Sequence, residues 1–200
     1  MPKIVNKQIK SQEIGRAALG VFRKYGYHRT TMADIANAAS VGKGTLYEYF
    51  KDKADILRYT FDDYFNAFKE GAVQVMAKAT IPGERLTALV EFALDHVAEW
   101  EDHCSIYVEY LGVAKREQKG SLSMDRFYEE FRAILKLLIE ESQIKSQLRQ
   151  EFDPEITAEL LLALFDGVVL HGIFVERSYD ADSIRSTALK LVTYGLFKEK

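Results

Sequence analysis

Apolar residues recur three and four positions apart along nearly all of this 200-residue sequence, and no stretch alternates apolar and polar residues between turn signals. The first pattern is typical of amphipathic α-helices, whereas the second would indicate β-strands. The chain is long enough to bury a sizeable core, either as one domain or as a small domain joined to a larger one. The sequence therefore predicts an all-α protein.

Charge is distributed unevenly along the chain, although the formal net charge is only -3. Residues 1–53 hold ten Lys or Arg against four Asp or Glu, whereas the remaining residues hold 17 basic and 26 acidic ones. A basic segment on an acidic body is typical of a nucleic-acid-binding module attached to a part with another task. We therefore predict a DNA-binding domain over residues 1–53 and a second domain over residues 54–200.

The remaining composition is that of an ordinary globular protein, with 48% hydrophobic and 28% charged residues. Cys104 is the single cysteine and cannot form an internal disulfide, and the amino-terminal residues do not read as an export signal. The longest apolar stretch, residues 160–175, contains Asp166 and His171 and is too short and too polar to span a bilayer. We expect a cytoplasmic protein without a membrane segment.

Start and stop signals divide the first domain into three helices and begin a fourth. The first helix ends at Gly26, and the second begins at Thr31, with Asp34 completing a capping box. The third covers about residues 43–49, and the fourth begins behind Asp52 and leads into the second domain. Further helices are expected over residues 84–100, 104–114, 123–148, 154–175 and 181–197, the fourth of these opened by the cap-and-proline pair Asp153-Pro154.

The second and third helices, joined by the turn at residues 40–42, form a helix-turn-helix, which places its second helix in the major groove of DNA. Glycines at the start of that helix allow a close approach to DNA, a lysine and a threonine can reach base edges or phosphates, and two tyrosines present hydroxyls to the backbone. Leu46 and Phe50 are expected to face inward. The residues predicted to face DNA are Gly42, Lys43, Gly44, Thr45, Tyr47 and Tyr49.

Catalytic, nucleotide and metal sites are not predicted. The Gly-Lys-Gly-Thr run at residues 42–45 lacks the preceding strand and the residue order of a nucleotide-binding loop. His96, His103 and Cys104 lack a fourth ligand at regular spacing. No nucleophile lies in a recognisable catalytic motif, so we expect no enzyme activity, no metal and no cofactor.

The segment FRKYGYHRTTMADIANAASVGKGTLYEYFKDKADIL resembles the DNA-binding region of the tetracycline-repressor (TetR) family of bacterial transcriptional regulators. The similarity covers about residues 8–57 and follows the order F-x-x-x-G-[YF]-x-x-T-T, I-A-x-x-A, K-G-T-L-Y-x-[YH]-F and x-x-K-x-x-[IL]. It implies that Thr30 and Thr31 cap the second helix and touch a phosphate. It also implies that Lys53, at the start of the fourth helix, holds a phosphate, and that an all-helical ligand-binding and dimerising domain follows.

The turn before the third helix departs from the family pattern, which commonly has Gly-Val-Ser where this sequence has Ser40-Val41-Gly42. Ser40 is therefore expected to adopt a left-handed conformation that usually falls to glycine. Gly42 lacks the hydroxyl that would cap the third helix and contact DNA. Base reading at this position is left open.

The second domain is rich in aromatic residues, which can line an apolar ligand pocket, although an ordinary core explains any one of them more simply. Polar residues inside apolar runs are more informative because burying them requires a partner. His96, Glu109, Asp166 and His171 are of this kind. The predicted effector-binding residues are Phe65, Phe68, His96, Trp100, Tyr107, Tyr110, Phe127, Phe131 and His171.

The last two helices are apolar on more than one face, so each must bury one face in its own domain and another elsewhere. A four-helix interface between two copies of the chain follows from this pattern and from the family resemblance. The predicted interface residues are Leu161, Leu164, Phe165, Val168, Gly172, Ile173, Leu191 and Gly195.

These features together predict a homodimeric transcriptional repressor that binds double-stranded operator DNA with an inverted repeat and is released by a small, largely apolar effector. An activator, or a regulator without a ligand, is compatible with the same features. A helical enzyme and a protein-interaction adaptor are alternatives from other classes, and retardation of promoter DNA by the purified protein would separate them from a regulator.

Overall fold

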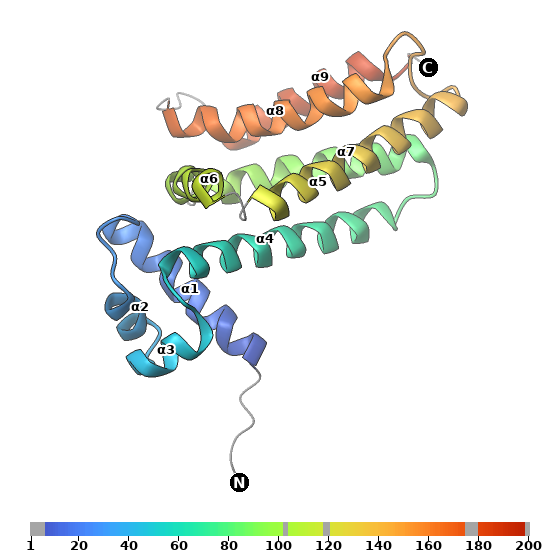
Figure 1. The fold of residues 1–200 in the computed structure, drawn as a ribbon. Coiled ribbons are helices and arrows are strands. Elements are labelled where there is room, and N and C mark those ends of the chain that lie inside the picture. The colour runs from blue at the N-terminus through green and yellow to red at the C-terminus, as the bar shows by residue number, and fades with distance from the viewer. Residues whose placement is uncertain (1–6, 102–103, 118–120, 175–179, 199–200) are drawn as a thin grey trace. The chain divides into compact units, whose positions relative to one another are not determined.

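The computed structural model describes residues 7–101, 104–117, 121–174 and 180–198. Side chains are described within these ranges except at residues 97–101, 104–105, 114–117, 121–124, 172–174 and 181. All regular elements in the described ranges are α-helices (Figure 1), which confirms the predicted all-α class. None of the described helices combines the length and the apolar character that crossing a membrane requires.

The helices form two compact units, and α4 (Lys53–Met76) contributes to both. The first unit also contains α1 (Lys7–Tyr25), α2 (Met32–Ala38), α3 (Lys43–Tyr49) and most of α6 (Cys104–Glu117). The second also contains α5 (Pro82–Glu101), most of α7 (Ser121–Ile144), α8 (Pro154–Phe174) and α9 (Ala181–Leu196). These units reflect packing, and the functional boundary after residue 53 stays a prediction.

The core of the first unit joins helices that follow one another in the sequence. Helix α1 packs against α2, and α2 against α3. Ile14, Ile35 and Leu46, one from each helix, are fully buried. Gly26 ends α1 as predicted, with a left-handed φ of 80°, and its N–H donates to the Phe22 carbonyl at 2.8 Å. The periodic apolar residues of the sequence therefore form one small core beneath α2 and α3.

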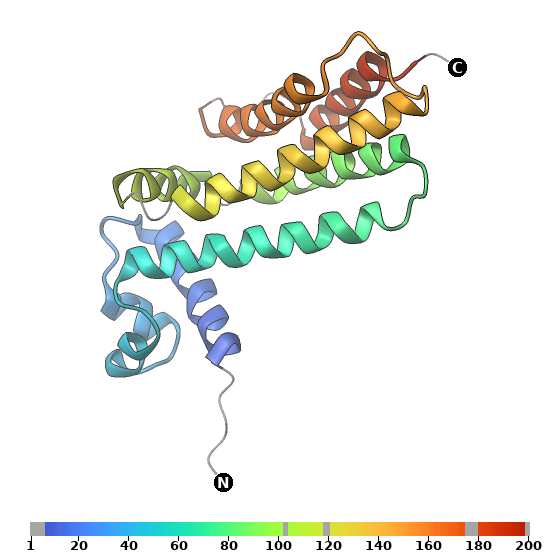
Figure 2. The same ribbon diagram turned by 45° about the vertical axis from the view of Figure 1, so that its right-hand side comes forward.

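The second unit joins helices that are far apart in the sequence, since α5 packs against both α8 and α9. Figures 1 and 2 both show α5 and α7 lying between the α8–α9 pair and the end of α4 that belongs to this unit. Arg185 of α9 pairs with Asp95 of α5 at the surface. The buried core side chains include Leu86, Leu89, Val90, Leu135, Ile139, Leu161, Ala188 and Val192.

Two predicted helix caps are confirmed. Asp52 accepts the Asp55 N–H at 2.8 Å where α4 begins. Asp153 accepts the Ile156 N–H at 2.9 Å ahead of Pro154, the first residue of α8. These contacts are local in sequence, which explains why the residue pattern alone identified both helix starts.

Helix α7 ends at Ile144, four residues before the predicted end at Leu148. Ser146 adopts a left-handed φ of 57°, and the Gln147 N–H turns back to the Ser142 carbonyl at 2.9 Å. Leu148 is buried even so, because it forms an isolated antiparallel bridge with Phe197 near the end of the chain. Leu148 therefore fits the apolar pattern of α7 although it lies in the following loop, which explains why the predicted helix is too long.

Candidate functional site

The turn that leads into α3 has the predicted conformation. Ser40 adopts a φ of 53°, and the Val41 N–H donates to the Ala36 carbonyl at 3.0 Å. Gly42 is the N-cap residue of α3, and no side chain caps the helix there. Ser40 therefore takes the strained position, and α3 begins without the usual hydroxyl.

The outer face of α3 carries most of the residues predicted to face DNA. Gly42, Lys43, Gly44 and Tyr47 are exposed, whereas Thr45 and Tyr49 are half-buried. A Cβ placed on Gly44 would meet no other atom within 4 Å, so the surface around it is open. Leu46 and Phe50 are buried on the opposite face, as expected. The helix thus offers one open polar face, while its apolar face fixes its orientation.

The two threonines before α2 face different surroundings. The exposed Thr31 accepts the Asp34 N–H at 3.2 Å and donates its hydroxyl to the Asp34 carboxylate at 2.6 Å, which confirms the capping box. The Asp34 carboxylate accepts from the Thr31 hydroxyl and also from the Thr31 backbone N–H, at 2.9 Å, and these two bonds hold the pKa of Asp34 below its ordinary value. Thr30 is buried and donates its hydroxyl to the Gly26 carbonyl at 2.8 Å. Burial does not support the predicted phosphate contact of the Thr30 side chain.

Lys53 points at its own chain. Its ammonium donates to the carbonyl oxygens of Tyr27, His28 and Thr30 at 2.7, 3.0 and 3.1 Å. It also lies 4.5 Å from the centre of the Tyr27 ring. The predicted phosphate contact would have to compete with these bonds.

The loop at residues 26–31 has a second partner that the sequence did not identify. His28 Nε2 lies 3.1 Å from the Glu109 carboxylate of α6. Glu109 is one of the polar residues that the sequence places within an apolar run, and its partner is 81 positions earlier in the chain. The structure therefore places Glu109 at the edge of the group of helices α1, α2 and α3, which we call the reading head.

The predicted effector residues of the first unit form part of its aromatic core. Phe65, Tyr107 and Tyr110 are buried. Phe61 stacks on Tyr110 with ring centres 4.2 Å apart, and the Phe65 ring lies 6.2 Å from Tyr110. Effector contact by these residues stays a prediction.

The predicted effector residues of the second unit whose side chains are described include an aromatic cluster. The centre of the Phe68 ring lies 5.3 Å from that of Phe131 and 5.2 Å from that of His96. The Phe127 ring lies 4.7 Å from Phe131. Phe92, absent from the predicted set, lies within 5.0 Å of both Phe68 and His96. Its position four residues before His96 places both on one face of α5.

The Phe92 ring fits into this cluster because residue 71 of the neighbouring helix is a glycine. A Cβ on Gly71 of α4 would lie only 2.5 Å from the tip of the Phe92 ring. His96 Nδ1 lies 2.8 Å from the Phe92 carbonyl, so this nitrogen carries the proton and donates. The described cluster is apolar apart from this ring. The Trp100 side chain lies outside the described residues, and His171 is exposed on α8.

Of the residues considered for a metal site, only His96 has a side chain among the described residues. His96 is engaged by the Phe92 carbonyl, while His103 and the Cys104 side chain lie outside the described residues. In the described part of the chain, no three His, Cys, Asp or Glu side chains gather closely enough to hold a metal ion.

Asp166 lies in a seam of polar contacts between α7 and α8. Both of its carboxylate oxygens accept the Tyr128 hydroxyl, at 2.8 and 2.9 Å. Further along the seam, Lys136 pairs with Glu155 at 2.6 Å. Burial raises the pKa of Asp166 above its ordinary value, and the hydrogen bond from Tyr128 opposes this shift.

Asp166→Asn should stabilise the protein at neutral pH. Because the folded pKa is raised, the stabilisation linked to protonated Asp166 is complete below the ordinary pKa and is lost as pH rises through the raised value. Asparagine cannot ionise and still accepts the Tyr128 hydroxyl. At pH 7.5 the unfolding temperature should rise by about 2–4 °C for each kcal/mol added to the free energy of unfolding. Near pH 4 the difference between variant and wild type should become smaller.

Glu151→Gln is the matched control, since Glu151 is exposed and the same carboxyl-to-amide change there should leave the unfolding temperature unaltered. An Asp166→Asn variant that unfolds at a lower temperature than the wild type at pH 7.5 would show that the charged carboxylate is favourable.

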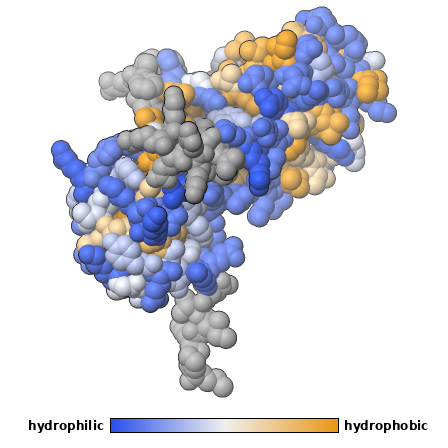
Figure 3. Space-filling view, in the orientation of Figure 1, coloured by the Kyte–Doolittle hydropathy of each residue, from blue (hydrophilic) through white to orange (hydrophobic). Residues whose placement is uncertain are grey.

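Helix α8 buries one of its faces and exposes another that is also largely apolar. Leu161 is buried in the core of its own chain, and Leu164 and Phe165 pack against that core. The exposed stripe of α8 consists instead of Ile156, Leu160, Ala163, Gly167 and His171. Apolar surface over this part of the molecule is visible in Figure 3.

Helix α9 also exposes apolar side chains, with Leu191 67% and Tyr194 75% exposed. Of the other predicted interface residues, Val168 and Gly195 are half-buried, and the side chains at Gly172 and Ile173 lie outside the described residues. We call the exposed residues of α8 given above, together with Leu191 and Tyr194, the α8–α9 stripe. It contains Leu191 of the predicted set and excludes Leu161.

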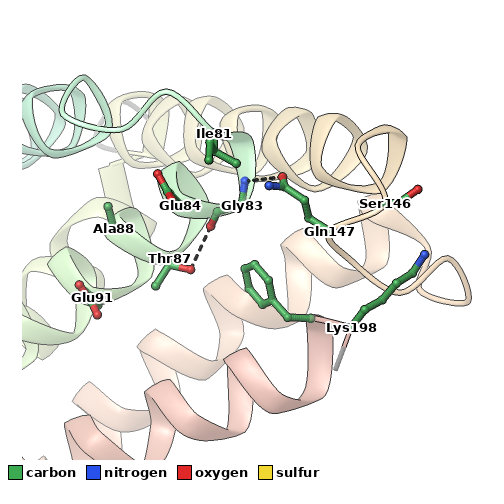
Figure 4. A pocket seen from close by; sticks show the side chains of 10 residues that line it. Ile81, Gly83, Glu84, Thr87, Ala88, Glu91, Ser146, Gln147 and Lys198 are labelled. Carbon is green, nitrogen blue, oxygen red and sulfur yellow. Dashed lines mark hydrogen bonds between the residues drawn. The ribbon is translucent and has the colours of Figure 1, made fainter. Parts of the chain in front are cut away.

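A separate hollow of about 620 Å³ lies at the start of α5 (Figure 4). Gln147 accepts the Gly83 N–H at 3.1 Å on one side. The Phe197 ring closes another side so tightly that a Cβ on Gly83 would lie 2.9 Å from it. Glu84 and Glu91 of α5 contribute carboxylates, and none of the predicted effector residues lines this hollow.

Two family models match the chain. Residues 14–60 match the model of bacterial regulatory proteins of the tetR family. Residues 82–194 match the C-terminal model of BetI-type transcriptional repressors. The first match covers α2 and α3, and the second covers most of α5 to α9.

Similar proteins extend along almost the whole chain. The fatty acid metabolism regulator protein of Bacillus subtilis is 23% identical over 190 residues, covering 95% of this chain and 97% of that protein. A putative transcriptional regulator from Saccharomonospora viridis in complex with choline has a TM-score of 0.83 at 20% identity, covering 96% of this chain and 100% of that one. The regulator FadR from Bacillus subtilis in complex with stearoyl-CoA has a TM-score of 0.66 at 22% identity, covering 92% and 97%. At these identities the solved structures show a shared fold.

Proposed function

This chain belongs to the TetR family of bacterial transcription regulators, and we propose that it is a homodimeric repressor released from its operator by a small, largely apolar effector. The open polar face of α3 carries the DNA-binding half of this proposal. It lies within residues 14–60, which match the model of bacterial regulatory proteins of the tetR family. The protein is a regulator rather than an enzyme, and we place it in the cytoplasm with the bacterial chromosome.

Lys43 and Thr45 are the proposed base-reading residues, because they flank the open surface at Gly44. Tyr47 and Thr31 are exposed and are proposed to contact the backbone, with Tyr49 beside them. Two copies of α3 must enter successive major grooves on one side of the duplex. The operator is therefore proposed to be an inverted repeat, with half-sites about 34–36 Å or a multiple apart.

The α8–α9 stripe is the proposed pairing surface with a second copy of the chain. An apolar face of two helices that is left exposed to water favours burial in an oligomer. Leu160 and Leu191 are 64% and 67% exposed, so each has most of its surface available to a partner. This proposal replaces Leu161 by Leu160 at the centre of the α8 contribution.

The aromatic cluster of Phe68, Phe92, His96, Phe127 and Phe131 is the proposed effector region. Its rings offer apolar surface, and His96 Nδ1 is directed at a backbone carbonyl. This composition suits a ligand with a hydrophobic body. The similar structures with choline and with stearoyl-CoA differ widely in ligand, so they supply compounds to test and do not identify the effector of this chain.

An effector should raise the unfolding temperature because it binds the folded protein. It should also weaken operator binding, because effector and operator favour different conformations of the dimer and each lowers the affinity for the other. A coupling of about 5- to 150-fold in operator affinity is the expected size. Choline and stearoyl-CoA would be tested first by thermal unfolding, then by fluorescence anisotropy with an operator selected from random DNA. Compounds that stabilise the protein but leave operator affinity unchanged would contradict the proposed release.

Phe131→Leu serves as the variant for this experiment, since it removes a ring from the cluster and keeps an apolar side chain of similar bulk. We expect it to weaken the response to the effector and to leave operator affinity unaltered in the absence of effector. An equal loss of both would show that Phe131 acts through the fold.

A further inference from the structure

We propose that Lys53 is a positioning residue, which holds the loop at residues 26–31 in the conformation that DNA binding requires, and that it does not serve as a phosphate ligand. The inference rests on the proposed DNA-binding function. It starts from the three hydrogen bonds that the Lys53 ammonium donates to the carbonyls of Tyr27, His28 and Thr30.

The ammonium has no capacity left for a phosphate in this arrangement. A lysine side chain carries three N–H donors and no acceptor, and all three donors have carbonyl partners at 2.7 to 3.1 Å. The bonds to Tyr27 and Thr30 are partly buried, so water cannot replace them freely. The Tyr27 ring, 4.5 Å away, adds attraction for the positive charge.

The loop held by Lys53 determines where α2 begins. Gly26 turns the chain with a left-handed φ, and the buried Tyr27 ring packs 5.2 Å from the Phe22 ring of α1. Thr30 closes the loop onto the Gly26 carbonyl, and Thr31 then caps α2. A change in the loop would therefore shift α2, and with it α3, which packs on α2.

Lys53 is also the first residue of α4, so its side chain joins the start of α4 to the start of α2. The three carbonyls converge from residues 23 to 26 positions earlier in the chain. A compact ammonium with three diverging donors suits this geometry, whereas the planar fork of arginine suits a phosphate. The three carbonyls are therefore arranged for an ammonium and not for a guanidinium.

Lys51 provides a matched control because it is exposed, and the described part of the chain offers no partner to its side chain. Lys51→Met and Lys53→Met remove the same charge from the same region of the head. Operator affinity would be measured from 50 to 300 mM salt, at a temperature where circular dichroism shows each variant fully folded. The operator would be one obtained with the wild type by selection from random DNA.

Lys53→Met should lower operator affinity about tenfold or more at every salt concentration, because lost bonds to a charged group are of that size. The slope of log affinity against log salt should stay at the wild-type value, since no phosphate contact is removed. Amide exchange in the loop at residues 26–31 should accelerate in the free protein. Lys51→Met should leave that exchange unchanged.

Lys53→Arg keeps the charge and tests the geometry, so it should also weaken binding and loosen the loop. A phosphate role predicts the opposite, namely that Arg restores wild-type affinity and that Met lowers the salt slope by about one unit. Either of those results would overturn the proposal. A role in stability alone would leave the affinity of the fully folded Lys53→Met protein unaltered, and that result would overturn it as well.

A failure of the proposed function is distinct from these outcomes. In that case the wild type itself would select no preferred site from random DNA, whereas the accelerated amide exchange of the loop in Lys53→Met would still be measurable.

Discussion

Leu160→Arg should give a folded monomer that binds its operator about 100-fold or more weakly than the wild type, because two linked heads gain that much from simultaneous binding. Leu160 lies in the α8–α9 stripe and is 64% exposed in the single chain, so arginine fits without disturbing the core. In a pairing surface, the same charge would be buried against a copy of itself. Sedimentation velocity measures the oligomeric state, and circular dichroism checks the helicity.

Leu137→Arg is the control for this experiment. Leu137 of α7 is 54% exposed and receives the same substitution outside the α8–α9 stripe. We expect this variant to remain dimeric and to keep wild-type operator affinity. A Leu160→Arg protein that still sediments as a dimer would place the pairing surface elsewhere.

Gly44→Glu should abolish operator binding and leave the fold intact. A Cβ added at Gly44 meets no other atom within 4 Å, and glutamate in the first turn of a helix is favourable, so the unfolding temperature should be equal or higher. On DNA, the carboxylate would face phosphates and base edges, where like-charge contact costs several kcal/mol. We expect a loss of about 100-fold or more in affinity, measured by fluorescence anisotropy.

Gly20→Glu supplies the comparison, because Gly20 of α1 is also exposed and also has open space around the added Cβ. Both variants carry the same new charge on a helix of the head. The Gly20 variant should lose far less affinity, since α1 is not the reading helix. Equal losses in the two variants would indicate a general charge effect and would remove α3 from its proposed role.

Most helix starts could be predicted from the sequence because their signals are local. The Thr31–Asp34 capping box and the Asp153 cap each join residues three positions apart, and both are confirmed. The left-handed φ of Ser40 was also expected, from the exchange of Ser and Gly across a short turn. Residue type and spacing were sufficient wherever a contact spans one helical turn.

The exposed face of α8 could not be identified in the same way. Its residues from 160 to 170 are apolar almost all round, so the helical period does not distinguish a core face from an exposed face. Leu160 and Leu161 are neighbours in the sequence, but Leu160 is exposed and Leu161 is buried in the fold. Packing against other helices, such as that of α5 against α8, makes the choice.

The position of Lys53 required tertiary information for a similar reason. The family resemblance implied a phosphate contact, whereas the structure shows carbonyl partners more than twenty residues away in the sequence. The members of the aromatic cluster were largely foreseen, but Phe92 depends on the space left by Gly71 of a different helix. Contacts between distant segments were beyond what residue spacing can specify.

The pairing of α5 with α8 and α9 also dictates an order of events during synthesis. Helices α1 to α3 find their partners among neighbouring segments, so their core can assemble as soon as the first part of the chain has left the ribosome. The inward face of α5 has to wait about 70 to 100 residues for its partners, and during that interval it presents leucines to chaperones. A chain interrupted after α5 would therefore consist of an assembled reading head and an α5 helix whose apolar face has no partner helices.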